Sequence, residues 1–197
     1  MCIRDSLGAV FDQCVGTVLK QVKLLRQLAN DFSSFAAVPV PKLERVPLAA
    51  LLHEVVEPYL AGLASHTEIS IDVAPDAPDA RADRTLLARA LTNLIENALQ
   101  AMPSGGRVTL SAAPDEADRV RVTCADNGIG MTSDAAERAF EPHFSTKTGG
   151  SGLGLANARQ NIASCGGTIT LESAPGQGTT VTVRLPVAGP DDARGGA

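Results

Sequence analysis

The sequence predicts an α/β two-layer sandwich, a mixed five-stranded sheet with helices on one face, preceded by a long helix. Three observations lead to this prediction. Five short segments have the alternating or β-rich pattern of strands. Helical segments with a single apolar stripe stand between or beside them in mixed order. Pro39 and Pro41 mark an extended linker after the first helix.

The composition narrows the class of protein. Of 197 residues, 44% are hydrophobic and only 3% aromatic, so aliphatic side chains must build the core. The net charge of −5, without a dense Lys/Arg run, argues against nucleic acid as a partner. No apolar run approaches the roughly 18 residues of a membrane helix. The cysteines form no C-x-x-C pair, and Cys124 and Cys165 are expected to be buried thiols in a reducing compartment.

The first helix is expected over about Leu7 to Phe35, where apolar residues recur at steps of three and four. Nothing precedes it to pack on, so its mate should be another helix, in the same chain or in a partner chain. We expect a partial helical unit over residues 1–36, a linker over 37–46, a second domain over 47–187 and a disordered tail over 188–197.

The second domain is expected to begin with a helix. In order, we expect a helix over Leu48–Ala64, a strand over Glu68–Val73, a helix capped by Asp83 and ending at Met102, strands over Arg107–Ala112 and Val120–Ala125, a helix over Leu153–Cys165, and strands over Thr168–Ser173 and Thr179–Leu185. The glycine-rich stretch from Asp126 to Gly152 has no clear assignment.

Asn93 and Asn97 stand four residues apart, so they share one face of their predicted helix, beside its apolar stripe. Asparagine is a middling helix former, and two of them at a buried edge need a reason. An amide oxygen is a hard ligand of the kind that Mg²⁺ accepts. From this helix alone, hydrogen bonding to a neighbouring loop or simple exposure is the simpler explanation.

Two glycine-rich runs follow. The first, Asp126-Asn127-Gly128-Ile129-Gly130-Met131, comes directly after a strand. Its carboxylate can accept a hydrogen bond from an exocyclic amine such as that of adenine, and its glycines allow a flat ligand to approach the backbone. The alternative is an ordinary Asp-Asn-Gly turn.

The second run, Gly149-Gly150-Ser151-Gly152-Leu153-Gly154-Leu155, opens a helix, where backbone N–H groups can surround phosphates. It is neither a Walker loop nor a dinucleotide fingerprint. Alone, it could equally be a hinge. Between the two runs lie Phe140 and Phe144, which suggest a lid anchored by its rings, and Lys147, which could pair with a terminal phosphate.

Together these pieces resemble the nucleotide-binding domain of sensor histidine kinases, within the ATPase superfamily shared with DNA gyrase, mismatch-repair ATPases and a heat-shock chaperone. The resembling segments, which span about Leu48 to Pro186, are NLIENA as the asparagine box, DNGIGM and GSGLGL as the glycine boxes, FEPHFSTK as the phenylalanine box, and the closing GQGTTVTVRLP. The first helix and linker resemble the second helix of the family's dimerisation hairpin, most like the nitrogen-regulatory kinases.

The resemblance implies a Bergerat-type ATP-binding fold, ATP and Mg²⁺ as cofactors, and transfer of the γ-phosphoryl group to a histidine. Asn97 would hold Mg²⁺, Asn93 would face the metal or the phosphates, and Asp126 would recognise adenine, with support from Thr179. The other implied nucleotide contacts are Gly128, Gly130, Lys147, Gly150, Ser151, Gly152, Leu153, Gly154 and Leu155. The implied partners are a second copy of the chain and a response-regulator receiver domain. We expect a cytoplasmic location, with any anchor in the inner membrane supplied by segments upstream.

Two histidines, His53 and His143, stand in or near motifs of the family. His53 opens a His-Glu-x-x-x-Pro pattern like the family's acceptor motif. It follows the linker, opens the nucleotide domain and lies too close to Asn97, so we expect the acceptor upstream of residue 1 and no self-phosphorylation by this chain. His143 stands where the family often has an aromatic residue, and we assign it no catalytic role.

Three other functions remain open from the sequence. A gyrase-like clamp ATPase would have a second domain after the sheet. An anti-sigma-type protein-serine kinase shares the boxes but lacks the long helix and linker. A degenerate docking module would have lost nucleotide binding, which the intact boxes argue against.

Overall fold

The computed structural model describes Val15, Gln21 and residues 40–60, 66–116, 118–146, 151–190 and 192. The chain divides into two units, residues 1–39 and 40–197. Val15 and Gln21 are helical, and the rest of the long helix predicted over Leu7–Phe35 lies outside the described residues.

A five-stranded sheet forms the centre of this unit, in the order β2-β4-β5-β7-β6. Its strands are β2 (Thr67–Val73), β4 (Gly106–Pro114), β5 (Arg119–Asp126), β6 (Thr168–Ser173) and β7 (Thr179–Pro186). β2 and β4 run parallel, and the other neighbours are antiparallel. The sheet is therefore mixed, as the sequence predicts.

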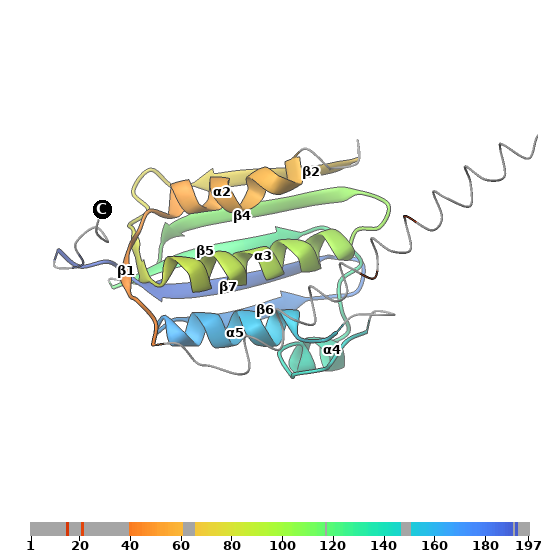
Figure 1. Cartoon of the computed structure of the whole chain (residues 1–197). Helices are drawn as coiled ribbons and strands as arrows, with labels where there is room; N and C mark the ends of the chain where they lie inside the picture. Colours follow the sequence, from red (N-terminus) through yellow and green to blue (C-terminus); the bar gives the residue numbers. More distant parts are fainter. Residues whose placement is uncertain are drawn as a thin grey trace, which may run out of the picture. The chain divides into compact units, whose positions relative to one another are not determined.

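Three helices cover one face of this sheet, α2 (Leu48–Leu60), α3 (Arg84–Gln100) and α5 (Gly154–Ser164) (Figure 1). The predicted two-layer arrangement is confirmed. A short helix, α4 (Ser133–Arg138), lies beyond α5 in the stretch that the sequence leaves unassigned. No helix among the described residues is long and apolar enough to cross a bilayer.

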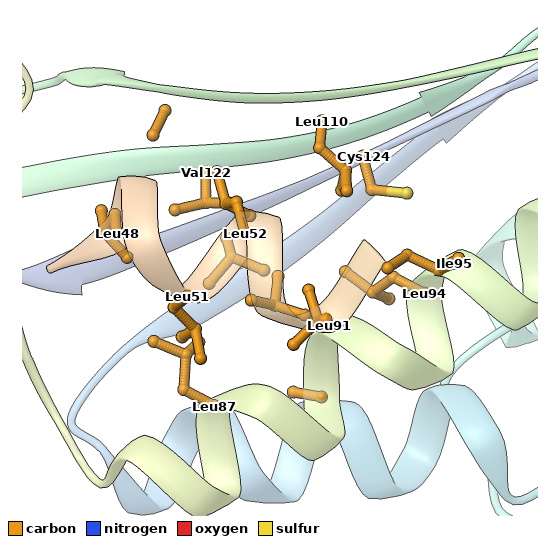
Figure 2. Close-up of a cluster of buried hydrophobic side chains, with 14 of the residues drawn as sticks. Leu48, Leu51, Leu52, Leu87, Leu91, Leu94, Ile95, Leu110, Val122 and Cys124 are labelled. Atoms are coloured by element: carbon orange, nitrogen blue, oxygen red, sulfur yellow. The ribbon is translucent and has the colours of Figure 1, made fainter. Parts of the chain in front are cut away.

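The core lies between the helices and the inner face of the sheet. β7 alternates buried and half-buried residues along its whole length, as expected for a strand with one covered face. Figure 2 shows leucines of α2 and α3 meeting sheet residues, among them Leu52, Leu91, Leu110 and Cys124. Cys124 and Cys165 are free and buried, as predicted. Aliphatic side chains fill this core, which explains how a chain poor in aromatic residues can fold.

The opposite face of the sheet is polar and its hydroxyl groups pair across strands. Ser70 Oγ lies 3.1 Å from Thr109 Oγ1, and Ser111 Oγ is hydrogen-bonded to Thr123 Oγ1. Such pairs satisfy hydroxyl groups that neighbouring strands partly cover. This face carries no apolar stripe to attract another layer.

The first turn of α3 is fixed by Asp83. Its Oδ1 accepts the backbone N–H groups of Thr85 and Leu86, each at 3.0 Å. This is the N-cap that the sequence predicts, and the helix ends two residues before Met102, ahead of Pro103. The apolar stripe of α3 contacts both α2 and α5, so α3 is the central helix of its layer (Figure 1).

Two three-residue strands, β1 (Glu44–Val46) and β3 (Ala80–Ala82), form a small antiparallel sheet at the start of the unit. The segment after β7 joins it, since Val187 bridges to Ala80 and Ala188 N–H donates to Asp79 C=O at 2.9 Å. The expected tail over 188–197 is described at 188–190 and 192, and Arg81 Nε bonds Asp192 at 2.9 Å. The last residues of the expected linker thus belong to the folded unit.

Candidate functional site

Three polar side chains interrupt the apolar inner face of the sheet at one end. Asp126 on β5 pairs with Thr179 on β7, and Thr179 pairs with Ser173 on β6. Directly opposed residues project on the same side, so these three side chains form a row across the strands. The same row continues to Val108 on β4, which is fully buried. A polar row against a dry core is the arrangement of a binding site rather than of packing alone.

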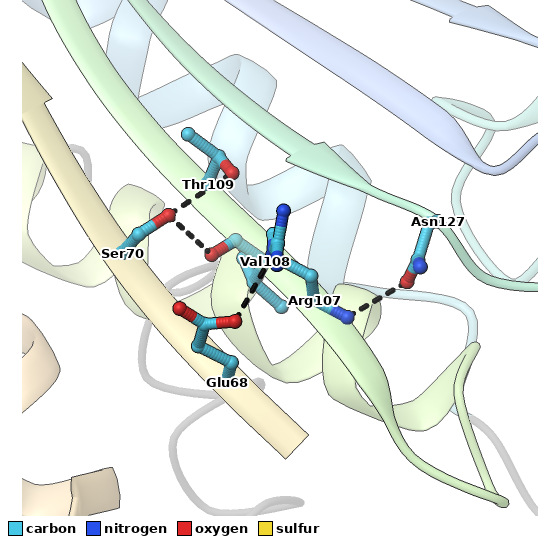
Figure 3. A network of polar contacts seen from close by, with 6 residues as sticks. All are labelled: Glu68, Ser70, Arg107, Val108, Thr109 and Asn127. Atoms are coloured by element: carbon cyan, nitrogen blue, oxygen red, sulfur yellow. Dashed lines mark hydrogen bonds and ion pairs between the residues drawn. The ribbon is translucent and has the colours of Figure 1, made fainter. Parts of the chain in front are cut away.

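The Asp126 carboxylate is oriented by its own loop. Its Oδ1 accepts the backbone N–H of Gly128 at 2.8 Å. The neighbouring Asn127 points elsewhere: its Oδ1 accepts the N–H of Arg107 at 2.7 Å, beside an ion pair between Arg107 and Glu68 (Figure 3). Asn127 therefore fastens the loop to the start of β4, and Asp126 remains in the polar row.

The loop after Asp126 packs directly onto the carboxyl end of α3. Ile129 N–H donates to Ala101 C=O at 3.0 Å. A Cβ at Gly128 would lie only 2.6 Å from the same carbonyl oxygen. Gly130 has a φ of 64°, and a Cβ there would collide with the carbonyl oxygen of Ala174. Both glycines were attributed from the sequence to the approach of a flat ligand, and the structure shows that contacts with protein backbone require glycine at both positions.

The β6–β7 turn closes the other side of this loop. Gly176 N–H donates to Ile129 C=O at 2.8 Å, and Met131 N–H donates to Ser173 Oγ at 2.9 Å. Gly178 has a φ of 78°, and a side chain there would collide with the carbonyl oxygen of Asp126. The loop after Asp126 and the β6–β7 turn are therefore held together by hydrogen bonds next to the polar row.

Asn93 and Asn97 are both half-buried on α3. A Cβ built on Gly154 would lie 3.3 Å from Asn97 Nδ2, so the second glycine run approaches the asparagine pair closely. Residues 57 positions apart in sequence thus meet because α3 packs against α5. The structure brings the predicted metal ligand to the amino end of α5.

The amino end of α5 begins at Leu153, whose apolar side chain makes no capping hydrogen bond. The Leu153 N–H lies 3.4 Å from Ser151 Oγ, so Ser151 of the second glycine run lies at this helix end. The N–H groups of the first turn and the helix dipole favour an anion there. Gly152 has a φ of 67°, and a side chain at this position would meet His143 at 2.5 Å. Lys147 and Gly150, which the sequence also assigns to phosphates, lie outside the described residues.

The segment between the glycine runs folds against α4 and α5. The Arg138 guanidinium stacks 4.3 Å over the Phe144 ring, and Arg159 lies 5.7 Å from Phe140. His143 N–H donates to Gly152 C=O at 3.0 Å, and His143 itself has a φ of 64°. Both predicted aromatic anchors are therefore engaged, each by an arginine that the sequence analysis did not single out.

The histidine of the His-Glu-x-x-x-Pro pattern lies on α2 and is not a member of the polar row of Asp126, Thr179 and Ser173. His53 is exposed on α2 and precedes Glu54, whose carboxylate pairs with Arg84. Its His-Glu-x-x-x-Pro pattern is thus part of a helix that packs on the sheet through Leu51, Leu52, Val55 and Val56.

These features fit a nucleotide with its magnesium ion. A carboxylate and a buried hydroxyl group lie at the end of the sheet where a base would be recognised, and the amide of Asn97 lies near the amino end of α5. Amide oxygen suits Mg²⁺, which takes its other ligands from phosphates and water. Neighbouring backbone atoms leave no room for a side chain at Gly128, Gly130 or Gly152, so only glycine fits at these three positions.

Comparison with known families decides the class. Residues 82–189 match the family described as histidine kinase-, DNA gyrase B-, and HSP90-like ATPase. The chain belongs to this family. The ATPase match covers the helix with both asparagines, both glycine runs and the closing hairpin, so the resemblance read from the sequence is confirmed.

Relatives of this ATPase domain include proteins named as sensor histidine kinases, such as ZraS of Klebsiella oxytoca, which is 51% identical over 71 residues, 36% of this chain and 15% of ZraS. The chain is 34% identical over 189 residues to the nitrogen regulation protein NtrY of Azorhizobium caulinodans, covering 92% of this chain but only 24% of NtrY. It therefore spans about a quarter of that relative's length.

Solved structures agree. A full-length ShkA structure in complex with AMPPNP has a TM-score of 0.75 and 31% identity, covering 90% of this chain and 39% of ShkA. The catalytic domain of histidine kinase ThkA has a TM-score of 0.67 and 27% identity, covering 74% of this chain and 96% of that domain. The unit from residue 40 onward is thus an ATP-binding catalytic domain of the histidine-kinase type.

Proposed function

We propose that this chain binds Mg–ATP and supplies the γ-phosphoryl group to a histidine on a helix of the full-length sensor kinase. The observation that carries the proposal is the close approach of Asn97 to the amino end of α5, in the same domain as the row of Asp126 and Thr179. Catalysis of phosphoryl transfer depends mainly on positioning and charge neutralisation, which these groups can provide.

Each group has a separate role in this proposal. The Asp126 carboxylate accepts a hydrogen bond from the exocyclic amine of adenine, and the hydrogen bond from Gly128 N–H keeps the carboxylate oriented. Asn97 ligates Mg²⁺, and Asn93 faces the metal or the phosphates. The N–H groups at the start of α5 hold phosphate, assisted by Lys147 and the backbone from Gly150. When bound, Mg–ATP supplies the electrophilic phosphorus, and the segment between the glycine runs excludes water.

The acceptor histidine is proposed to lie upstream of residue 1, so this chain alone should not become labelled. His53 belongs to α2, whose buried side packs against the sheet. The proposed partners are a second copy of the chain through the first helix and a response-regulator receiver domain. ThkA has been solved in complex with the response regulator TrrA, which supports a receiver as partner.

A calorimetric titration with ATP and Mg²⁺ tests nucleotide binding. Asp126→Asn keeps an oxygen for Gly128 N–H but removes the carboxylate charge, so affinity should fall roughly tenfold or more. Asn97→Ala should weaken binding only when Mg²⁺ is present. Asp72→Asn, on the exposed side of β2, is the matched control and should bind like the wild type. Equal, weak binding by all four proteins would instead indicate a degenerate docking module.

Phosphorylation is tested by incubating the chain with radiolabelled ATP and measuring the acid and alkali stability of any label. We expect no label on this chain alone. Acid-labile label that disappears in His53→Ala would overturn the assignment of the acceptor. Acid-stable label would indicate a serine kinase of the anti-sigma type.

A further inference from the structure

Ser173 is the one residue of the polar row that the proposed function does not use. It ends β6, opposite Thr179, and its hydroxyl group lies at the junction of the glycine loop and the β6–β7 turn. The question is what a third polar group contributes beside Asp126 and Thr179.

The Ser173 hydroxyl has three partners. It accepts the N–H of Met131 at 2.9 Å, lies 2.9 Å from Gly178 C=O and lies 3.0 Å from Thr179 Oγ1. Loop, turn and strand are thus joined through one oxygen atom. Thr179 is only 7% exposed, so water cannot easily substitute for the contact.

A count of protons fixes the direction of these bonds. A serine hydroxyl has one hydrogen and two acceptor sites, and a backbone carbonyl oxygen can only accept. Ser173 therefore donates its hydrogen to Gly178 C=O and accepts from Met131 N–H. The contact with Thr179 is left with one possible direction, in which the Thr179 hydroxyl donates to Ser173.

This direction limits the hydrogen bonds that the Thr179 hydroxyl can make. Once its hydrogen is committed to Ser173, Thr179 Oγ1 can act toward any other group only as an acceptor. Asp126, directly opposite on β5, also acts as an acceptor, since its Oδ1 accepts the N–H of Gly128. The row therefore presents two acceptors and no hydroxyl donor on the inner face.

We propose that Ser173 is a positioning residue for base selection: by taking the Thr179 hydrogen, it makes the site favour a purine with an amino group at C6 over one with a carbonyl oxygen there. The 6-amino group can donate a hydrogen to each acceptor, whereas a 6-oxo group has none to donate and only the neighbouring ring N1–H of such a base can do so. This proposal rests on the proposed nucleotide site. It adds the residue that sets the polarity of that site.

The test is a pair of calorimetric titrations with the full chain and Mg²⁺, one with ATP and one with inosine triphosphate, which carries oxygen in place of the 6-amino group. In Ser173→Ala, the Thr179 hydroxyl can rotate and donate to that oxygen. The ratio of the two affinities should then fall roughly fivefold, about the worth of one hydrogen bond. Loss of loop support alone would weaken both nucleotides equally and leave the ratio unchanged.

Two further variants keep the test sharp. Ser173→Thr retains the hydroxyl and should restore the wild-type ratio. Ser111→Ala removes the other serine that pairs with a threonine across two strands, but on the opposite face of the sheet, and should leave both affinities unchanged. Thermal melting of each variant reports whether the fold is intact.

The outcomes separate the two proposals. Wild-type protein that binds neither nucleotide contradicts the proposed function itself, and this inference with it. Wild-type protein that binds both equally, or a Ser173→Ala variant with an unchanged ratio, leaves nucleotide binding intact and overturns the role of Ser173.

Discussion

Asp83 and Lys42 are joined by a hydrogen bond across 41 residues of sequence, from the Lys42 backbone N–H to Asp83 Oδ2 at 2.9 Å. The other oxygen of the same carboxylate caps α3. One side chain thus holds both the end of the linker and the start of the helix that carries Asn93 and Asn97. The Asp83 carboxylate therefore links the backbone at Lys42 to the first turn of α3.

Substitutions of Asp83 can distinguish its bond to Lys42 from its capping of α3. Asp83→Ala should lower the free energy of unfolding by about 1–2 kcal/mol, the usual cost of a lost cap. Asp83→Ser should recover most of this, because one hydroxyl can cap α3, yet it lacks a second oxygen for Lys42. Urea denaturation measures the first effect, and amide exchange at Lys42 measures the second. Equal exchange in wild type and Asp83→Ser would show that the linker bond contributes nothing.

The three positive-φ glycines around the β6–β7 turn should respond differently to alanine. Gly176 has open space around its would-be Cβ, so Gly176→Ala should cost about 1 kcal/mol from backbone strain alone. Gly130→Ala and Gly178→Ala add a collision with backbone carbonyls and should cost several times more, with loss of ATP binding. Denaturation midpoints and ATP titrations check this. A Gly176→Ala variant as damaged as the others would contradict the steric explanation.

Burial, with a smaller contribution from the Asp126 charge, raises the pKa of the Cys124 thiol from 9.0 to about 12. The folded state therefore favours the neutral thiol, and the unfolded chain ionises first. Stability from this group is complete below pH 9.0 and is lost as pH rises toward about 12. In folded protein, iodoacetamide should spare Cys124, as peptide mapping would show, and urea should expose it. Rapid alkylation without denaturant would contradict its burial.

The Gly189 N–H, followed by the nearby Arg81 and Arg45 guanidinium groups, holds the pKa of Asp192 below its ordinary value. A lowered carboxyl pKa stabilises the folded state above the ordinary value of 3.8, and this contribution is lost as pH falls through the lowered one. Asp192→Asn imitates protonation at neutral pH. It should speed amide exchange at Gly189, measured by NMR, and leave the urea midpoint nearly unchanged. Unaltered exchange at Gly189 would show that the carboxylate does not hold this segment.

Much of the fold could be predicted because long elements have strong patterns. All five strands of the main sheet and the helix capped by Asp83 were predicted within a few residues. β1, β3 and α4 were missed, since three residues cannot display alternation and six cannot display a helical stripe. The helix predicted to reach Ala64 is described only to Leu60.

The candidate residues of the site could be named from short motifs, but the contacts between them could not. Asp126, Asn97 and the glycines were proposed because their motifs resemble those of the kinase family, and their roles stay predictions. The role of Ser173 depends on which residue of β7 lies opposite it and on how the glycine loop folds back, and both are set by strand register and long-range packing. The arginines over Phe140 and Phe144 likewise depend on tertiary contacts that no short motif encodes.

The three-residue strand β3 has a neighbour on each side: β1, at the end of the linker, and Val187, just after β7. The segment that enters the folded unit and the segment that follows β7 therefore both pair with β3. A fluorescent reporter fused after Asp192 would follow the segment that bridges to β3, so its effect on the pairing of β1 with β3 should be measured before such a fusion is used to follow signalling. For the same reason, a small dye attached there is well placed to sense force arriving along the linker.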